Sequence, residues 1–218
     1  MLRADLHVHS KYSDGRNSVK EILKAALEKR LNIIAITDHN TVQGSLEAIE
    51  VVHNEQLPLI VVPGIEISAK EGHILVYGIK EDLEPGLSIK EVAEKVKKQN
   101  GVIALAHPFN FFKKGVLNPF KVINYVDAIE VFNAKVYFGI TNYLAQNLCN
   151  MFKKSMIGGS DAHSVEMLGY GLTIFNGVTN SDQVLNDIKE GKTYVMGKKI
   201  PFFIQIKHSI NKVTEKWL

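Results

Sequence analysis

Histidine and carboxylate side chains recur in short motifs between residues 7 and 163 of this chain. His7 and His9 are one residue apart, and because side chains alternate faces along a strand, both imidazoles would point the same way. Later motifs add seven more candidate ligands, at Asp14, His39, Glu66, His73, His107, Asp161 and His163. A single His-X-His pair is a weak signal, but this recurrence predicts a hydrolytic centre that holds several metal ions.

The donor types indicate which metals would bind. Imidazoles combined with carboxylates favour zinc, manganese or iron over calcium and magnesium, which prefer oxygen ligands. The imidazoles of His7 and His9 and the seven further ligands are more than one ion can hold, so we expect two to three divalent ions. Glu66 is the only glutamate in the set and is the expected bridge between two ions.

Two other carboxylates join Glu66 as candidate catalytic residues. Asp161 is a ligand candidate in Ser-Asp-X-His, and Asp38 directly precedes the ligand His39. We expect Asp38 to orient an imidazole from behind, the way carboxylates support metal-bound histidines. The alternative for Asp38 is a cap on the turn that follows it.

Apolar, β-branched runs alternate with helical patterns along the chain. The expected strands are 2–8, 33–37, 59–68, 74–79, 102–106, 128–132, 156–159 and 172–175, and the expected helices are 18–29, 42–52, 89–99, 140–152 and 181–190. This alternation predicts an α/β fold with a mostly parallel sheet of about seven strands. Most of the candidate ligands fall near the C-terminal ends of these strands, the edge at which active sites assemble in such folds.

Together these motifs resemble the PHP family, which is named for polymerase and histidinol phosphatase. The resemblance covers residues 1 to about 176 and implies a distorted seven-stranded (β/α)7 barrel. It implies three metal sites, one made by His7, His9, Glu66 and Asp161, a second by Glu66, His73 and His107, and a third by Asp14, His39 and His163. Some family members have histidine in place of Asp14, so the third site here is expected to be weaker or to prefer a harder metal. The implied reaction is phosphoester hydrolysis by a metal-bridging hydroxide.

Three residues beside these motifs are candidates for substrate binding. Arg16 could hold a phosphate through two hydrogen bonds, although an exposed loop arginine is an equally good interpretation. Asn133 and Lys135 follow another strand end, beyond Glu130, and we expect them near the substrate. Lysine pairs such as Lys113-Lys114 are better explained as solvated surface, but pairs that converge around the metal site would instead attract a phosphorylated substrate.

The expected substrate is a small phosphorylated metabolite, such as histidinol phosphate or a nucleotide. An exonuclease or phosphodiesterase acting on short nucleic acids would use the same chemistry. Two further alternatives are a non-catalytic accessory PHP module, which would be expected to lack ligands, and C–N hydrolysis of the amidohydrolase kind. The sequence leaves the substrate, the metal and the oligomeric state open.

Composition sets the remaining expectations. With 218 residues, 45% of them hydrophobic, the chain can form one domain over 1–218, with a short basic C-terminal extension from about residue 200 and a strand at 201–207. The formal charge of +3 argues neither for nor against nucleic acid, which we expect as a substrate only. The single cysteine, Cys149, excludes an internal disulfide. Without a signal peptide or an apolar span, we expect a cytoplasmic protein with no membrane partner.

Overall fold

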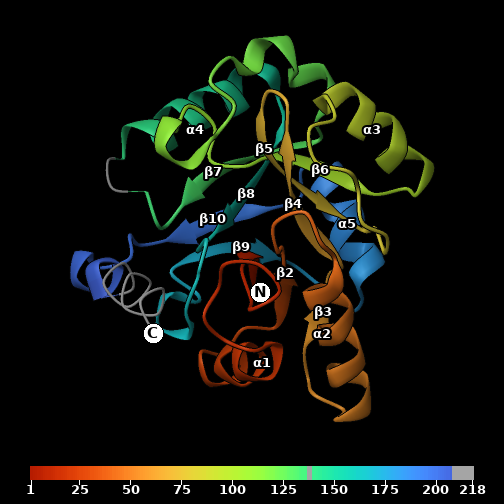
Figure 1. Ribbon diagram of the computed structural model, residues 1–218, viewed down its shortest axis with the longest axis vertical. Helices are drawn as coiled ribbons and strands as arrows, with labels where there is room; N and C mark the ends of the chain where they lie inside the picture. Colours follow the sequence, from red (N-terminus) through yellow and green to blue (C-terminus); the bar gives the residue numbers. More distant parts are fainter. Residues whose placement is uncertain (137–138, 208–218) are drawn as a thin grey trace.

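The computed structural model describes residues 1–136 and 139–207 and shows two five-stranded sheets (Figure 1). The first sheet has the order β10-β9-β1-β2-β3, with β1 (Leu2–Val8), β2 (Ile33–Ile36), β3 (Ile60–Val61), β9 (Gly171–Phe175) and β10 (Tyr194–Gly197). The second has the order β4-β5-β6-β7-β8, with β4 (Gly64–Ala69), β5 (Gly72–Tyr77), β6 (Val102–Leu105), β7 (Ala128–Asn133) and β8 (Ser155–Gly159). The chain therefore leaves the first sheet after β3, completes the second, and returns.

The fold is mixed α/β, as the sequence predicts, but its sheets are not mostly parallel. β1–β2, β2–β3, β6–β7 and β7–β8 are parallel pairs, whereas β1–β9, β9–β10, β4–β5 and β5–β6 are antiparallel. Among the described residues no closed seven-stranded barrel is formed. Instead, the two sheets meet at two seams through the isolated bridges Val8–Ala162 and His39–Glu66.

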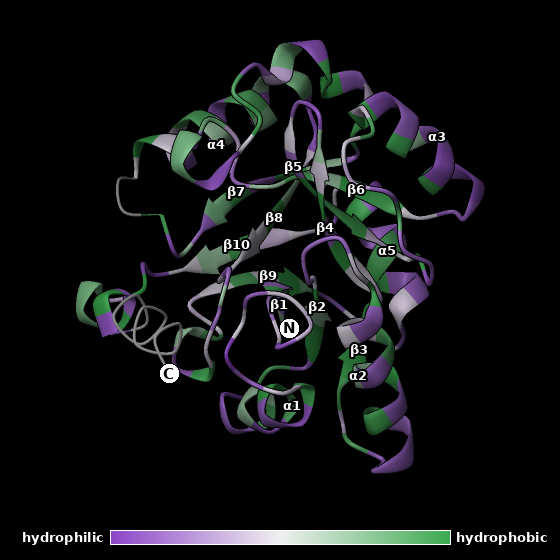
Figure 2. Cartoon of the chain, viewed as in Figure 1, coloured by the Kyte–Doolittle hydropathy of each residue, from purple (hydrophilic) through white to green (hydrophobic). Residues whose placement is uncertain are grey.

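In the described part of the chain, five helices lie outside the sheets, besides the short helical segment at residues 202–207. They are α1 (Val19–Glu28), α2 (Gln43–Asn54), α3 (Ile89–Lys98), α4 (Ile140–Phe152) and α5 (Ser181–Lys189). In α1 and α3 the N-cap serines, Ser18 and Ser88, form capping boxes with Glu21 and Glu91, and this satisfies backbone N–H groups that a helix end leaves without partners. In Figure 2 the strands are mainly apolar and the helices carry polar residues on their outer faces.

One part of the core lies between the two sheets. Leu6 of β1 and Phe175 of β9 pack in one buried cluster with Leu75 and Tyr77 of β5 and Ile157 of β8. The Tyr77 hydroxyl donates to the backbone oxygen of Leu6 at 2.9 Å, which ties the sheets together. Burial of such side chains stabilises the fold by roughly 1.5–3 kcal/mol each.

Three sequence expectations for the elements are wrong. The run 59–68 is two strands rather than one, because Pro63 has no N–H to donate to a ladder and separates β3 from β4. Residues 202–207 are helical rather than a strand, because Pro201 suits a helix start, where its carbonyl accepts from Ile204 and Gln205. The edge strand β10 was not predicted. Its large apolar side chains, Tyr194 and Met196, are exposed, so it lacks the buried face on which the strand predictions relied.

Residues 208–218 of the expected C-terminal extension lie outside the described residues. None of the helices in the described part of the chain has the length and apolar character needed to cross a membrane.

Candidate metal centre

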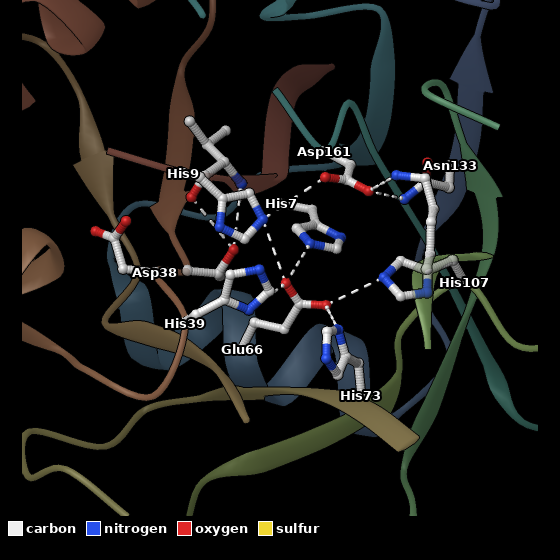
Figure 3. Close-up of polar contacts among 12 residues, drawn as sticks. His7, His9, Asp38, His39, Glu66, His73, His107, Asn133 and Asp161 are labelled. Carbon is white, nitrogen blue, oxygen red and sulfur yellow. Dashed lines mark hydrogen bonds and ion pairs between the residues drawn. The ribbon is translucent and has the colours of Figure 1, made fainter. Parts of the chain in front are cut away.

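The predicted ligands meet where the two sheets join (Figure 3). His7 and His9 lie at the end of β1, His39 follows β2, Glu66 is in β4, His73 begins β5, His107 follows β6, and Asp161 and His163 follow β8. Neighbouring imidazoles are close, with ring centroids 4.3 Å apart for His9 and His163 and 5.8 Å apart for His73 and His107. The fold thus brings all the predicted ligand positions together, Asp14 included.

Glu66 is buried at the middle of this cluster. Its Oε1 lies 3.0 Å from His73 Nδ1 and 3.1 Å from His107 Nε2. Its Oε2 lies 3.3 Å from a ring nitrogen of each of three more histidines, His7, His9 and His39. A carboxylate with imidazoles on both oxygens is suitably placed to bridge two cations, the role expected for Glu66.

Asp14 and Asp161 lie on two sides of the cluster. Asp14 Oδ1 is 3.2 Å from His163 Nε2 and 3.8 Å from His39 Nε2, which matches the third predicted set. Asp161 Oδ1 is 3.6 Å from His9 Nε2, within the first predicted set. The nine side chains therefore form one continuous group with overlapping ligand sets.

The donors fit divalent cations. Within the described part of the chain, both ring nitrogens of His9, Nδ1 of His39 and Nδ1 of His107 are buried without a hydrogen-bond partner. A buried polar atom left unsatisfied costs roughly 1–3 kcal/mol, so several in one cluster indicate that another group normally binds there. Imidazole nitrogen and carboxylate oxygen are ligands that zinc, manganese and iron accept.

Burial and neighbouring charges shift the titration of these groups. Burial opposes the charge on Glu66, but His7 and hydrogen bonds from His107, His7 and His73 hold the pKa of Glu66 well below its usual range. Burial lowers the pKa of His107, which favours the neutral imidazole that binds metals. Burial likewise opposes the charge on Asp161, but the ammonium groups of Lys113 and Lys135 hold its pKa well below the usual value.

Glu130 supports the ligands from behind. Its Oε1 lies 2.9 Å from His7 Nδ1, and its Oε2 accepts from the backbone N–H of His107 at 2.8 Å. Asn133 donates to both Glu130 and Asp161 at 3.1 Å. A carboxylate behind a ligating histidine fixes the ring and its tautomer, so Glu130 is the outer partner of His7. The sequence indicated only that Glu130 ends a strand at this edge.

Gly159, at the end of β8, allows His7 to pack closely against that strand. A Cβ atom at this position would lie 2.4 Å from His7 Cβ and 3.0 Å from Glu130 Oε1. The close approach of the backbone to the cluster therefore requires glycine here.

Asp38 does not orient an imidazole. It accepts hydrogen bonds from the backbone N–H and hydroxyl of Ser10 at 2.7 and 2.6 Å, and from the Ser13 hydroxyl at 2.6 Å. Figure 3 shows its carboxylate pointing away from the histidines. Asp38 therefore fixes the loop that carries Asp14, and its expected catalytic role has no contact to support it.

Asp5, like Asp38, fixes a neighbouring loop through hydrogen bonds, and this role was not predicted from the sequence. This buried β1 carboxylate accepts from the Ser160 hydroxyl at 2.6 Å and from the Gly169 N–H at 2.8 Å. Burial raises the pKa of Asp5 to about 6. The available signal was an aspartate between the apolar residues Ala4 and Leu6 of a predicted strand.

Lysines line the cavity of about 230 Å³ that opens over the cluster. Lys113 contacts Asp161, and Lys135 Nζ lies 2.8 Å from His163 Nδ1. Lys114 is exposed but also lines this cavity, so the Lys113-Lys114 pair fits the alternative in which lysines converge around the metal site. Lys135 and Asn133 are beside the ligands as expected. Arg16 does not line the cavity, although its backbone N–H donates to the His163 carbonyl at 2.9 Å.

Comparison with known families gives two matches. Residues 5–84 match the model of the PHP domain, and residues 139–193 match that of a PHP-associated segment. The first match contains six of the nine candidate ligand positions, and the other three, His107, Asp161 and His163, lie beyond it.

Relatives of similar sequence include proteins of different activities. Uncharacterized protein MJ1587 of Methanocaldococcus jannaschii is 36% identical over 157 residues, 67% of this chain and 90% of that protein. The 5'-3' exoribonuclease Rnm of Escherichia coli is 34% identical over 98 residues, 44% of this chain and 33% of the enzyme. The 3',5'-nucleoside bisphosphate phosphatase of Chromobacterium violaceum is 32% identical over 100 residues, 43% of this chain and 34% of the enzyme. The chain thus matches about a third of the length of each of these two enzymes.

Solved structures share the fold. PsfC from Pseudomonas syringae superposes with a TM-score of 0.76 at 19% identity and covers 98% of this chain and 99% of its own. A two-domain protein from Bacteroides vulgatus, which contains a predicted PHP-like metal-dependent phosphoesterase, has a TM-score of 0.73 at 20% identity, covering 90% of this chain and 65% of its own. At these identities the likeness establishes the fold alone.

Proposed function

The chain belongs to the PHP domain family of metal-dependent phosphoesterases, and from this premise we propose that it hydrolyses a phosphomonoester of a small metabolite or nucleotide. The observation that carries the proposal is the cavity in which imidazoles and carboxylates suited to cations face three lysines. Such a cavity can hold the metals and the negatively charged phosphate group side by side.

The charge of the cavity supports a monoester. A phosphomonoester carries a charge of about −1.5 to −2 at pH 7, whereas a diester carries a single charge. Lys113, Lys114 and Lys135 all line the small cavity. Three ammonium groups around one phosphate balance the dianion better than the monoanion of a diester.

The roles of the side chains follow from their positions. Glu66 and the surrounding histidines would hold the cations, while Glu130 keeps His7 in one orientation through the 2.9 Å contact. Divalent ions, when bound, polarise the phosphoester and make water a stronger nucleophile. Lys113 and Lys135 would bind phosphate oxygens and keep the phosphorus atom over the ligand cluster. Asn133 orients Asp161 through its 3.1 Å hydrogen bond.

The test is phosphate release by protein loaded separately with zinc, manganese or iron. The panel contains histidinol phosphate, nucleoside monophosphates, nucleoside bisphosphates and a 5'-phosphorylated oligonucleotide, with bis(p-nitrophenyl) phosphate as a diester. We expect metal-dependent release from at least one monoester, at a higher kcat/KM than for any diester. Absence of hydrolysis with every metal would reject the proposal.

A phosphodiesterase or exonuclease is the second candidate, and the likeness to the exoribonuclease Rnm favours it. It predicts the opposite order of rates, with the oligonucleotide or diester hydrolysed faster than every monoester. The same panel therefore separates the two activities.

A further inference from the structure

A second cavity lies beside the metal cavity, and the two share a wall. It has a volume of about 670 Å³, against about 230 Å³ for the metal cavity. The side chains of Phe112, Lys113 and Lys135 line both. The rest of the second cavity is mostly apolar and includes Phe111 and Ile140. A ligand can therefore extend from the metal cavity directly into an apolar space.

The loop that carries the phenylalanines is fixed by its own hydrogen bonds. The Gly115 N–H donates to the Asn110 carbonyl at 2.9 Å, and the His73 N–H donates to the Lys114 carbonyl at 2.8 Å. A Cβ atom on Gly115 would lie only 2.2 Å from the His107 backbone oxygen, so the loop closes tightly on a ligand residue. The aromatic wall and the metal ligands His73 and His107 therefore form one connected unit.

Two rings on this loop are presented to solvent. Phe111 is 72% exposed and Phe112 is 92% exposed, and the two rings meet edge to face with centroids 5.9 Å apart. Large apolar side chains on an ordered loop beside a polar site are typical of ligand-binding walls, which combine apolar surface with a few charged groups. Aromatic side chains also stack on the flat rings of nucleobases, largely independently of sequence.

The charges of the two cavities define the ligand further. Lys113 and Lys135 line both cavities, whereas the metal-ligand cluster lines only the smaller one and Phe111 lines only the larger one. The complementary molecule has a phosphate at one end and a flat apolar ring at the other. A volume of about 670 Å³ is within the range of roughly 300–1,000 Å³ of small-molecule sites, and far more than a phosphate alone needs.

We propose that the cavity lined by Phe111, Phe112, Val136 and Ile140 binds the base of a mononucleotide whose phosphate is held at Lys113 and Lys135. The inference rests on the proposed phosphoesterase function and narrows its substrate class to nucleotides. The ring of the leaving nucleoside packs against Phe111 and Phe112, so these residues determine specificity and take no part in bond breaking. Phosphate esters without an aromatic ring lack this contact and bind more weakly.

The experiment compares the wild type with the double variant Phe111→Ala/Phe112→Ala. The binding probe is a phosphonate analogue of AMP, in which carbon replaces the ester oxygen, and inorganic phosphate serves as the base-less probe. Both are titrated by calorimetry into metal-loaded protein. In parallel, kcat/KM is measured for AMP and for ribose 5-phosphate, which has the same phosphate and sugar but no base.

A matched control is Phe120→Ala. Phe120 is 56% exposed, lines neither cavity, and packs its ring against Phe152 at 6.0 Å. Phe120→Ala removes one exposed phenyl ring of the same kind without touching the proposed base site, so all four measurements should keep their wild-type values.

We expect the double variant to lose about tenfold in affinity for the AMP analogue and in kcat/KM for AMP, within the range that stacking on aromatic residues provides. Phosphate affinity and kcat/KM for ribose 5-phosphate should stay within about twofold. Equal losses for both probes would assign the loop a structural role only and overturn the inference, as would an unchanged affinity for the analogue. Absence of hydrolysis of every ester rejects the proposed function, while the two binding titrations still decide whether the base site exists.

Discussion

Asp5 holds Ser160 through two hydrogen bonds, from the hydroxyl at 2.6 Å and from the backbone N–H at 3.0 Å. Asp5 lies in β1 of the first sheet, and Ser160 begins the loop that follows β8 of the second. The Asp5–Ser160 pair thus joins the two sheets at the residue that directly precedes Asp161 in the chain. Asp5 is a positioning residue for that ligand.

Replacement of Ser160 by alanine should weaken this join. Ser160→Ala removes the 2.6 Å hydrogen bond to a buried carboxylate and is expected to lower the free energy of unfolding by roughly 1–3 kcal/mol, measured by urea denaturation. Ser155→Ala, at the other end of β8, is the matched control and should lower the free energy of unfolding by less. Equal losses in the two variants would contradict the role given to the Asp5–Ser160 pair.

Glu66→Gln should remove the charge at the middle of the cluster while keeping the shape of the side chain. Because both Glu66 oxygens face imidazoles at 3.0–3.3 Å, we expect the metal content per chain to fall by at least one ion. Phosphate release should fall by more than the roughly 10- to 100-fold typical of losing an outer-shell partner. Elemental analysis and the phosphate assay measure both, with the exposed Glu84→Gln as control. Wild-type metal content in Glu66→Gln would exclude a bridging role.

Chelation should destabilise the protein. An ion that binds only the folded state stabilises it by about 2.7 kcal/mol at a free concentration 100 times its dissociation constant. We therefore expect the Tm to fall after treatment with EDTA and to recover on addition of manganese or zinc, followed by differential scanning calorimetry. In Glu66→Gln the recovery should be much smaller. An unchanged Tm after removal of all metal would argue against a cluster that depends on cations.

Lys135→Ala should weaken substrate binding. Lys135 Nζ lies 2.8 Å from His163 Nδ1 at the edge of the cavity, where it can reach a phosphate oxygen. A hydrogen bond to a charged group contributes roughly 1.5–3 kcal/mol, so we expect KM to rise about tenfold or more. The control is Lys121→Ala, an exposed lysine that lines neither the metal cavity nor its apolar neighbour. A KM that stays at the wild-type value would remove Lys135 from the site.

Cys149 should react slowly while the protein is folded. Burial raises the pKa of this thiol to about 11, so the folded state keeps the proton at a pH where the unfolded chain, with a pKa near 9, begins to lose it. Because the folded state binds more protons between pH 9 and pH 11, ionisation of Cys149 makes stability fall as pH rises through that window. At pH 8 we expect modification by DTNB to be about 100-fold slower than in 6 M urea. Equal rates in the two conditions would show that the thiol is accessible.

The ligand positions were predictable because they depend on strand ends. The segments after β1, β2 and β8 meet at the seams between the sheets, and His107 after β6 reaches Glu66 there, so short motifs far apart in sequence become neighbours. The α/β class followed from the alternation of apolar runs and capped helices. The directions of the strands could not be predicted from this alternation, because β4 and β5 form a hairpin in which Ala69 pairs with Gly72 and the chain reverses.

The supporting groups were harder to predict, because their roles depend on which loop folds over which. The sequence predicted Lys113 to be a solvated surface residue. In the structure, the turn at Gly115 places Lys113 in contact with Asp161. Asp38 sits next to a ligand in sequence, yet its carboxylate binds Ser10 and Ser13 on a neighbouring loop. The apolar 202–207 segment resembled a strand, but Pro201 begins a helix there.

The two seams have a mechanical consequence. His7 and His9 belong to the first sheet and Glu66 to the second, and the distance between them across the seam is 3.3 Å at each contact. An ion bound to both would be a cross-link between the halves of the molecule, in a chain whose single cysteine cannot form an internal one. How firmly the two halves are held together would then depend on the supply of metal.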